Sequence, residues 1–395
     1  MSSSSSFSSI TAISLILLLL NLCCPFDTLL AKSKLSNSPT FHQHHSHKNP
    51  LHQAYIALQA WKLVIYSDPN NFTSNWVGPS VCNYTNVYCA SSPHDPLIQV
   101  VAGIDLNHGD IAGILPDELG LLSDLAFLHL NSNRFCGILP STLANLILLY
   151  ELDLSNNRFV GRFPLVVLSL PSLMYLDLRY NEFEGPIPSE LFNKTLDAIF
   201  VNNNRLTSVI PSNIVGSTAS VIVFANNNLG GCLPPNIDKL ANSLEELLLI
   251  NTNLSGCLPP EVGYLYKLRV LDVSSNKLVG PIPYSIAGLA HVEQLNFAHN
   301  MMTGTVPAGV CVLPSLKNFT FSYNFFCEEE GPCQNLTSRG IVFDERRNCL
   351  PGKPLQRSKK VCDAVLAHQV DCFDYHCGGS GAAAATPLLS PPGHF

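Results

Sequence analysis

Apolar and polar positions recur in one fixed order along most of the chain. The stretch LDLSNNRFVGRFP, residues 152–164, is one copy, and similar stretches return every 23 to 25 residues. Neither a helical nor a strand period describes such a stretch by itself, so the repeat is the primary structural signal. Alignment on Leu-x-x-Leu-x-Leu-x-x-Asn-x-Leu-x-Gly-x-Ile-Pro gives ten copies, with the Asn position at Gly109, Asn133, Asn157, Asn181, Asn204, Asn227, Thr252, Asn276, Asn300 and Asn324.

Each part of the repeat has a physical role in a stack of coils. The Leu-x-Leu unit predicts a short strand whose two apolar side chains point inward, where neighbouring coils complete a core that one coil could not bury. The recurring Asn has an amide that can both donate to and accept from backbone groups at the turn, which predicts a stacked Asn ladder. The recurring glycines permit turns that a β-carbon would obstruct; they are Gly137, Gly161, Gly185, Gly231, Gly256, Gly280 and Gly304.

The predicted fold class is therefore α/β: a leucine-rich repeat solenoid, or horseshoe, of about ten 24-residue repeats with disulfide-stabilised caps at both ends. The N-terminal cap is expected to include an amphipathic helix from Ala54 to about Tyr66. The expected segments are a signal peptide at 1–31, a His/Ser-rich linker at 32–53, an N-terminal cap at 54–98, repeats at 99–326, a Cys-rich C-terminal cap at 327–377 and a short Gly/Ala/Pro tail at 378–395.

Several features indicate a secreted protein. Residues 10–22 form an apolar run of signal-peptide length, too short to cross a bilayer, and no later apolar stretch reaches eighteen residues. We therefore expect a secreted, extracellular protein without a transmembrane anchor. Asn-x-Ser/Thr sequons predict glycosylation at Asn71, Asn83, Asn193, Asn253, Asn318 and Asn335.

The cysteines suit an oxidising compartment. Fourteen are present, and removal of Cys23 and Cys24 with the signal peptide leaves an even number. Cys82 is expected to pair with Cys89, and Cys232 with Cys257, because the latter two occupy the same slot of adjacent coils. Cys136 and Cys311 have no obvious partners. The connectivity of six C-terminal cysteines stays open: Cys327, Cys333, Cys349, Cys362, Cys372 and Cys377.

Charge is unevenly distributed along the chain. Residues 54–338 hold 12 Lys/Arg and 23 Asp/Glu, a net charge of −11, whereas residues 339–360 hold seven bases and two acids. An acidic body disfavours nucleic acid and favours cationic partners.

No catalytic or cofactor motif is present. The chain lacks a Gly-x-Ser-x-Gly elbow, a His-Glu-x-x-His motif, a phosphate loop and the kinase signatures, so we expect no enzyme and no cofactor. The histidines of HQHHSH, residues 42–47, lie in a polar stretch without further ligands, which favours a solvated linker over a metal site.

The candidate site lies on the sheet face of the coils. The residue between the two strand leucines points outward, which gives the row Asp105, His129, Asp153, Asp177, Phe200, Val223, Leu248, Asp272, Asn296 and Thr320. An apolar patch in the middle of this row is flanked by acids and tyrosines, as expected for a protein-binding surface that takes a basic, Cys-bridged peptide. The predicted peptide-binding residues are Asp153, Tyr175, Asp177, Arg179, Tyr180, Phe200, Val223, Leu248 and Asp272.

Several long stretches resemble one family. FTSNWVGPSVCNYTNVYCA, LYELDLSNNRFVGRFP, LPSLMYLDLRYNEFEGPIP and VDCFDYHC are similar to the repeat domain of plant leucine-rich repeat extensins, over about residues 54–377. This resemblance implies a location in the cell wall or apoplast and an influence on wall expansion. It also implies a disulfide-linked homodimer and binding of rapid alkalinization factor peptides, which are secreted, basic and disulfide-bonded. The sequence departs from that family in its tail, where TPLLSPPGHF stands in place of the long Ser-Pro-rich extensin segment, so whether the wall association is covalent stays open.

Two other functions compete with peptide binding. The protein could inhibit a secreted polygalacturonase, because such inhibitors are also secreted ten-coil proteins of this repeat type. It could instead be a structural wall protein without a soluble ligand, with cell-wall polysaccharide as its partner. Inhibition assays and peptide binding distinguish these functions.

Overall fold

The computed structural model describes residues 49–368 and 370–372. The chain divides into two compact units, which we describe separately. The first unit contains the described residues up to Asn228 together with Ser243–Leu249, and the second contains Leu229–Asn242 and the described residues from Ile250 onward. The predicted signal peptide, most of the linker including the histidines of 42–47, Cys23, Cys24, Cys377 and the tail at 378–395 lie outside the described residues.

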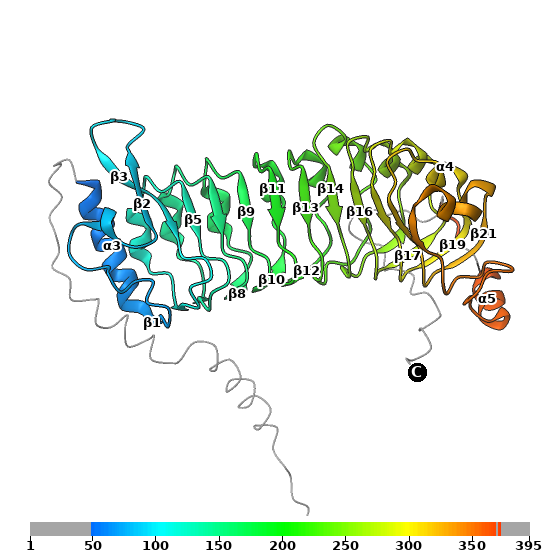
Figure 1. The fold of residues 1–395 in the computed structure, drawn as a ribbon, viewed down its shortest axis with the longest axis horizontal. Coiled ribbons are helices and arrows are strands. Elements are labelled where there is room, and N and C mark those ends of the chain that lie inside the picture. The colour runs from blue at the N-terminus through cyan, green and yellow to red at the C-terminus, as the bar shows by residue number, and fades with distance from the viewer. Residues whose placement is uncertain (1–48, 369, 373–395) are drawn as a thin grey trace, which may run out of the picture. The chain divides into compact units, whose positions relative to one another are not determined.

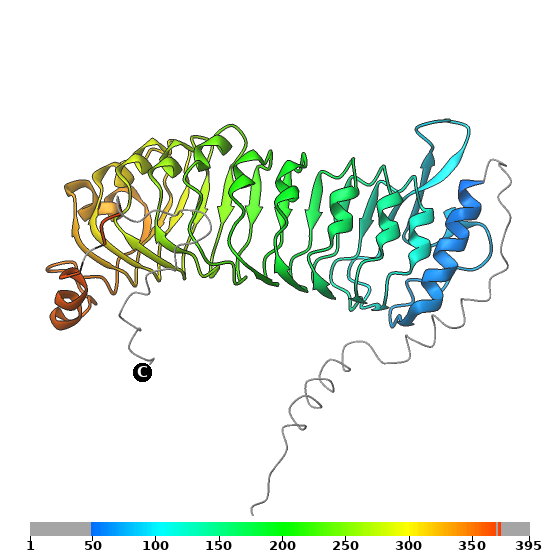
Figure 2. The same ribbon diagram turned by 180° about the vertical axis from the view of Figure 1, so that it is seen from behind.

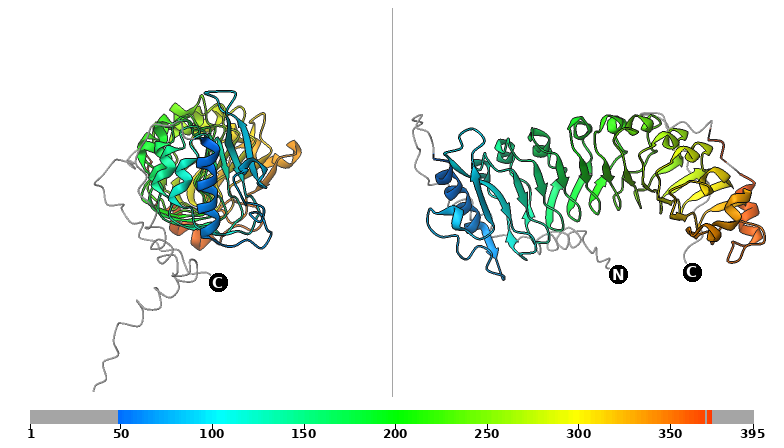
Figure 3. Two further views of the ribbon diagram at one scale, coloured as in Figure 1. Left: turned by 90° about the vertical axis from the view of Figure 1, so that its left-hand side faces the viewer. Right: turned by 45° about the horizontal axis from the view of Figure 1, so that its top comes forward.

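The first unit begins with α3 (Pro50–Val64), four residues earlier than the sequence predicted. The side chain of Asn49 accepts a hydrogen bond from the backbone N–H of Leu51 at 3.0 Å, and Pro50 occupies the first turn, where its missing N–H costs nothing. Helix α3 ends because the chain continues into β1 (Ile65–Ser67), which pairs antiparallel with β4 (Ala112–Gly113). Figure 3 shows α3, in blue, at the end of the sheet of this unit.

Parallel strands from successive coils form the main sheet of the first unit (Figure 1). Its order is β2 (Val87–Ser91), β3 (Gln99–Asp105), β5 (Phe127–His129), β7 (Glu151–Asp153), β9 (Tyr175–Asp177), β11 (Ala198–Phe200), β13 (Val221–Val223) and β14 (Glu246–Leu248), with only β2–β3 antiparallel among these pairs. A second parallel sheet contains β6 (Cys136–Gly137), β8 (Arg158–Arg162), β10 (Glu182–Pro186) and β12 (Arg205–Thr207).

The remaining side of each coil is a single 3-10 turn, and these turns follow one another in Figure 2. In the first unit the 3-10 segments are η1 (Val81–Asn83), η2 (Asp117–Leu121), η3 (Ser141–Asn145), η4 (Leu165–Ser169), η5 (Ser189–Asn193) and η6 (Ser212–Gly216). Most begin directly after a proline, which fixes its own φ and directs the chain into the turn. Buried leucines and aromatic residues, including Trp61, Trp76 and Phe135, fill the interior between strands and turns.

The second unit repeats the same coil. Its main sheet contains β16 (Val270–Asp272), β18 (Gln294–Asn296), β20 (Asn318–Thr320) and β22 (Val342–Asp344), and its second sheet contains β15 (Ser255–Cys257), β17 (Lys277–Gly280), β19 (Met301–Val306) and β21 (Phe325–Glu329). Its helical segments are η7 (Ile237–Leu240), η8 (Pro260–Tyr264), η9 (Tyr284–Gly288), α4 (Ala308–Cys311), η10 (Gly331–Arg339) and α5 (Lys359–Leu366).

The Asn ladder is confirmed. Asn157 represents it: its Nδ2 donates to the carbonyl oxygens of Leu130, Leu154 and Ser155, and its Oδ1 accepts from the backbone N–H of Phe135 at 3.0 Å. One amide thus joins its own coil to the preceding one and satisfies backbone groups that burial would otherwise leave unpaired. The glycine turns are confirmed as well; Gly161, for example, has φ 91°.

The repeats extend further than predicted. Strand β22 pairs in parallel with β20. Asn348 is fully buried and accepts from the N–H of Phe326 while donating to the carbonyl oxygens of Phe321 and Glu345, so it occupies one more ladder position. The repeats therefore continue for one coil beyond the predicted boundary at residue 326. The sequence pattern did not identify this coil because Phe343 and Glu345 stand where the repeat has its two strand leucines.

One of the two predicted disulfides forms. Cys82 bonds to Cys89 as expected, but the predicted bond between Cys232 and Cys257 is wrong, because Cys257 bonds to Cys372. The Cys372 sulfur lies 2.2 Å from the point where a β-carbon of Gly280 would be, so this pairing depends on glycine at that position. The other disulfides between described residues join Cys311 to Cys333 and Cys349 to Cys362.

The remaining described cysteines are Cys136, Cys232 and Cys327. Cys136 and Cys232 are also disulfide-bonded, whereas Cys327 carries a free thiol in the described part of the chain. Disulfides of this number are typical of proteins that fold in an oxidising, extracellular setting.

Candidate functional site

The predicted row on the sheet face exists in the first unit. Strand register places Asp105, His129, Asp153, Asp177, Phe200, Val223 and Leu248 opposite one another on consecutive strands. All of them are half-buried except Asp177, whose carboxylate is completely buried. We call these seven residues the face row. Its acidic side contains the aspartates and its apolar side runs from Phe200 to Leu248.

Asp177 differs most from the expectation of an exposed acid. Its Oδ2 lies 2.9 Å from Nε of Arg179 and accepts a hydrogen bond from the Tyr175 hydroxyl at 3.4 Å. Its Oδ1 accepts from the backbone N–H of Arg179 at 3.1 Å. The carboxylate is thus covered by two neighbours on its own coil, and a ligand would first meet Tyr175 and Arg179.

Burial raises the pKa values of both Asp177 and Tyr175. Burial, followed by the nearby charge of Asp153, raises the pKa of Asp177 to about 7, despite the opposing effect of Arg179. Burial and the charges of Asp177 and Asp153 raise the pKa of the Tyr175 hydroxyl to about 12. The acidic side of the face row therefore gains negative charge as the pH rises through neutrality.

Aromatic and cationic groups connect the acidic and apolar sides. The Tyr175 and Phe200 rings lie 5.7 Å apart between centroids, and Cζ of Arg179 lies 5.0 Å above the Phe200 ring. A guanidinium over a ring face is a favourable cation–π geometry. The face of the Phe200 ring therefore contacts the guanidinium group of Arg179.

Three other predicted site residues lie on different elements of the chain. Asp153 stands on β7, where its Oδ1 accepts from the backbone N–H of Ser155 at 2.9 Å. Tyr180 lies in the turn after β9, with φ 53°, and is exposed. Asp272 belongs to the second unit, where its Oδ2 accepts from Nδ2 of Asn296 at 2.8 Å and its Oδ1 accepts from the N–H of Ser274.

Sequence reasoning missed a second group on the same face. Phe127 packs against Tyr88 and His129, with ring centroids 5.7 Å and 5.0 Å away, and Nε2 of His129 lies 2.9 Å from Oε2 of Glu151. Phe127 lies two residues before His129 on β5, and Glu151 lies two residues before Asp153 on β7. Alternate residues of a strand share a face, so the strand period of 2 could have identified both. Gly103 makes room here, because a β-carbon would lie 2.0 Å from the Phe127 ring.

The predicted glycosylation sites differ in exposure. Asn71, Asn83, Asn193 and Asn253 are exposed and Asn318 is half-buried, whereas the side chain of Asn335 lies outside the described part. Exposure is what glycosylation requires, and it remains a prediction at these positions.

Residues 49–368 and 370–372 contain neither a candidate metal site nor a helix that could span a membrane. No three His, Cys, Asp or Glu side chains there are grouped so that they could hold a metal ion. None of the helices in the same residues combines the length and the apolar character needed to cross a bilayer.

Stacked coils, an Asn ladder and a row of strand residues define a leucine-rich repeat protein, and residues 124–146, 172–193 and 267–289 match the Leucine Rich Repeat family. Leucine-rich repeat extensin-like protein 4 of Arabidopsis thaliana is 55% identical over 347 residues, which cover 87% of the chain and 69% of that protein. The chain belongs to the leucine-rich repeat extensin-like family, whose members are non-enzymatic.

Longer relatives match over the same region. Leucine-rich repeat extensin-like protein 2 and pollen-specific leucine-rich repeat extensin-like protein 3, both of Arabidopsis thaliana, are 55% and 61% identical over 87% and 86% of the chain. The matched region is 43% and 47% of those two proteins, so the chain spans less than half the length of each.

Solved structures with the same fold include plant receptor ectodomains. The Arabidopsis receptor kinase HAESA in complex with the peptide hormone IDA and the co-receptor SERK1 aligns with a TM-score of 0.66 and 26% identity, over 75% of this chain and 54% of that chain. The plant peptide hormone receptor RGFR1 in complex with RGF2 aligns with a TM-score of 0.57 and 26% identity, over 60% and 38%.

Proposed function

We propose that this chain is a secreted cell-wall protein that binds basic, disulfide-bonded signalling peptides of the rapid alkalinization factor type and thereby modulates wall formation and expansion. The face row is the binding surface. One observation carries the proposal: an apolar strip of Phe200, Val223 and Leu248 lies in register beside Asp153 and its neighbours on one sheet face.

The chemistry of this face suits a cationic peptide. Asp105 on β3 and Glu151 and Asp153 on β7 are half-buried carboxylates, and they would attract lysine and arginine side chains. The neighbouring strip would bury apolar peptide side chains, and apolar contacts at the centre of an interface contribute most of the affinity. The excess of acids over bases in residues 54–338 would speed the encounter.

Related proteins support the same assignment. HAESA and RGFR1 hold peptide hormones on the same repeat fold, and the extensin-like relatives cover most of this chain. A peptide is therefore a ligand class that this architecture accommodates elsewhere.

The test is calorimetric titration of the full chain with a folded, disulfide-bonded peptide of this type. Binding is expected at micromolar concentration or below. The double variant Phe200→Glu/Leu248→Glu should weaken binding by about thirtyfold or more, the effect of losing a central contact of about 2 kcal/mol. Leu165→Glu is the matched control, because this leucine is exposed at the start of η4 and not on the sheet face.

Each contrary outcome has a clear meaning. Absence of heat at micromolar peptide would remove the proposal, and equal losses in the control and the double variant would remove the face row as the site. Inhibition of a secreted polygalacturonase without peptide binding would instead assign the protein to the inhibitor function.

A further inference from the structure

The C-terminal end of the second unit carries positive charge that its own acids do not neutralise. In residues 339–360 the acids are Asp344 and Glu345. Asp344 pairs with Arg346 at 2.8 Å, and Lys353 pairs with Glu345 at 2.8 Å and with Glu329 at 3.0 Å. Both acids of the segment are therefore occupied.

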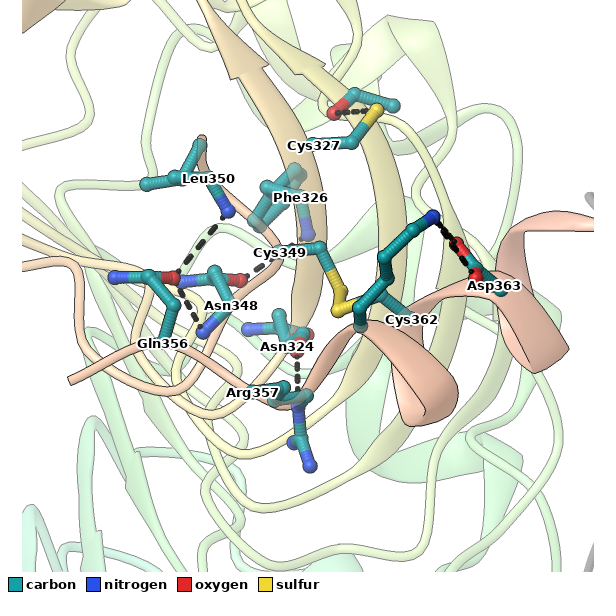
Figure 4. The surroundings of a disulfide bond; sticks show 12 residues. Asn324, Phe326, Cys327, Asn348, Cys349, Leu350, Gln356, Arg357, Cys362 and Asp363 are labelled. Carbon is teal, nitrogen blue, oxygen red and sulfur yellow. Dashed lines mark hydrogen bonds and ion pairs between the residues drawn. A yellow bond between two sulfur atoms is a disulfide. The ribbon is translucent and has the colours of Figure 1, made fainter. Parts of the chain in front are cut away.

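Arg347 and Arg357 have no carboxylate within ion-pair distance in the described part of the chain. They stand on two backbone segments that pair with each other, because the N–H of Arg347 donates to Leu355 and the N–H of Arg357 donates to Asn348. The disulfide between Cys349 and Cys362 ties this loop to α5 (Figure 4). Two like charges are thus held near each other by the covalent and hydrogen-bonded framework.

Arg357 is held in place but its outer nitrogens are unused. Its Nε donates to the carbonyl oxygen of Asn324 at 2.7 Å, and its Cζ lies 4.2 Å above the Phe325 ring. Figure 4 shows its two terminal nitrogens beyond this hydrogen bond, directed away from the other labelled residues. Burial and the charge of Arg347 lower the pKa of Arg357, so its charge is in an unfavourable position that an anion would relieve.

An exposed aromatic pair lies in the same row as Arg347. His299, Tyr323 and Arg347 each precede a ladder asparagine, and each has a positive φ, of 56°, 58° and 58°. The His299 and Tyr323 rings stack with centroids 4.2 Å apart and planes 12° apart. We call His299, Tyr323, Phe325, Arg347 and Arg357 the basic aromatic patch.

We propose that the basic aromatic patch binds the carboxylated sugar units of an acidic polysaccharide. Guanidinium groups with free N–H donors match carboxylates in a two-point geometry. Flat, exposed rings offer surface on which the apolar face of a sugar ring packs. A uronic acid unit combines both features, whereas an acidic peptide would use the guanidinium groups and leave the stacked rings unused.

This site is distinct from the proposed peptide surface. The basic aromatic patch belongs to the second unit and the face row to the first, and the two surfaces have opposite charge. The protein would therefore hold a cationic ligand and an anionic polymer through different residues. Neither proposal depends on the other.

The experiment measures binding of the full chain to three probes by calorimetry: oligogalacturonide, the same oligomer fully methyl-esterified, and polyglutamate. Oligogalacturonide should bind, and its ester at least about tenfold more weakly because the charge-assisted hydrogen bonds are lost. Arg347→Gln/Arg357→Gln should lose about tenfold or more in affinity. The matched control, Lys359→Gln/Lys360→Gln, removes the same charge from exposed positions on α5 and should change affinity less than about threefold.

Tyr323→Ala separates sugar from peptide recognition. It should weaken oligogalacturonide binding severalfold and leave polyglutamate binding unchanged. Absence of oligogalacturonide binding, or equal losses in the arginine and lysine variants, would overturn the proposal. Polyglutamate binding that equals oligogalacturonide binding and ignores Tyr323 would assign the patch to an acidic protein partner instead.

Two measurements keep the outcome interpretable. Arg347→Gln alone serves if the double variant fails to fold, because Arg347 is exposed whereas Arg357 packs on Phe325. Peptide titration of the arginine variants should be unchanged, so failure of one proposal is distinguished from failure of the other.

Discussion

At the scale of single residues, burial decides what a charge does. Asp177 sits in the same register column as Asp153, yet Tyr175 and Arg179 cover only Asp177. Its pKa of about 7 therefore depends on the environment that its own coil provides. The same residue type in the same repeat position can thus have a buried or a half-buried side chain.

The first residue-scale prediction concerns the pH dependence of stability. The pKa of Asp177 is about 7 in the folded chain against 3.8 for a free side chain, so the folded state binds the extra proton between these values. Stability contributed by this group is present below about pH 4 and is lost as the pH rises through 7, by at most about 4 kcal/mol. Relative to the parent, Asp177→Asn should therefore become more stable as the pH rises from 4 to 8.

Urea unfolding at several pH values measures this difference. Asp117→Asn, at an exposed carboxyl on η2, is the control and should follow the parent at every pH. A constant difference between Asp177→Asn and the parent across this range would show that the carboxyl titrates normally in the folded chain.

The second residue-scale prediction concerns the ladder. Asn157→Ala removes the acceptor for the buried N–H of Phe135 and the donor to three carbonyl oxygens. Each buried group left unpaired costs about 1 to 3 kcal/mol, so we expect a loss of several kcal/mol in the free energy of unfolding. Asn157→Asp should be damaging as well, because an ionised carboxylate cannot donate.

Chemical denaturation of these variants checks the prediction, with Asn145→Ala as control at an exposed asparagine at the end of η3. A loss for Asn157→Ala no larger than that of the control would mean that water or a neighbouring group replaces the amide.

At the scale of elements, the strands and turns follow from the repeat, but the cap connections do not. Leu152 and Leu154 on either side of Asp153 are sufficient to place β7 and the face row by sequence alone. The cover over Asp177 was not predictable, because it depends on side-chain directions of Tyr175 and Arg179. The bond from Cys257 to Cys372 was not predictable either, since it joins residues 115 positions apart through a non-repeating segment.

We predict that the docking of helix α5 depends on one disulfide. The helix is tied to the segment that follows β22 by the bond from Cys349 to Cys362, 13 residues apart. Closing a loop of this size stabilises the docked state by about 3 kcal/mol in the chain-entropy description. Cys349→Ser/Cys362→Ser should therefore release α5 while the repeats stay folded.

Hydrogen exchange resolves this effect by element. Amides of α5 should lose protection in the double variant, and those of β16 and β18 should keep theirs. Retained protection in α5 would show that its packing, and not the disulfide, holds it in place.

At the scale of the whole molecule, the two ligand classes that we propose are matched to two surfaces of opposite charge. The acidic face row lies on coils of the first unit, and the basic aromatic patch lies at the last coils of the second. The sequence predicted the acidic body and the basic segment from composition. It could not identify Arg347 and Arg357 as the unneutralised pair, because that required knowing which acids Arg346, Lys353 and Lys359 already occupy.

The ladder also bears on how such proteins change length over evolution. In the first unit each amide serves its own coil and the one before it in the same way, as Asn133, Asn157 and Asn181 show. A gene that duplicates or deletes one complete repeat there would leave every remaining amide with its usual partners. The coils already vary from 23 to 25 residues, so a change of one or two residues fits between ladder positions, whereas the number of strands on the sheet face can change only in whole-repeat steps.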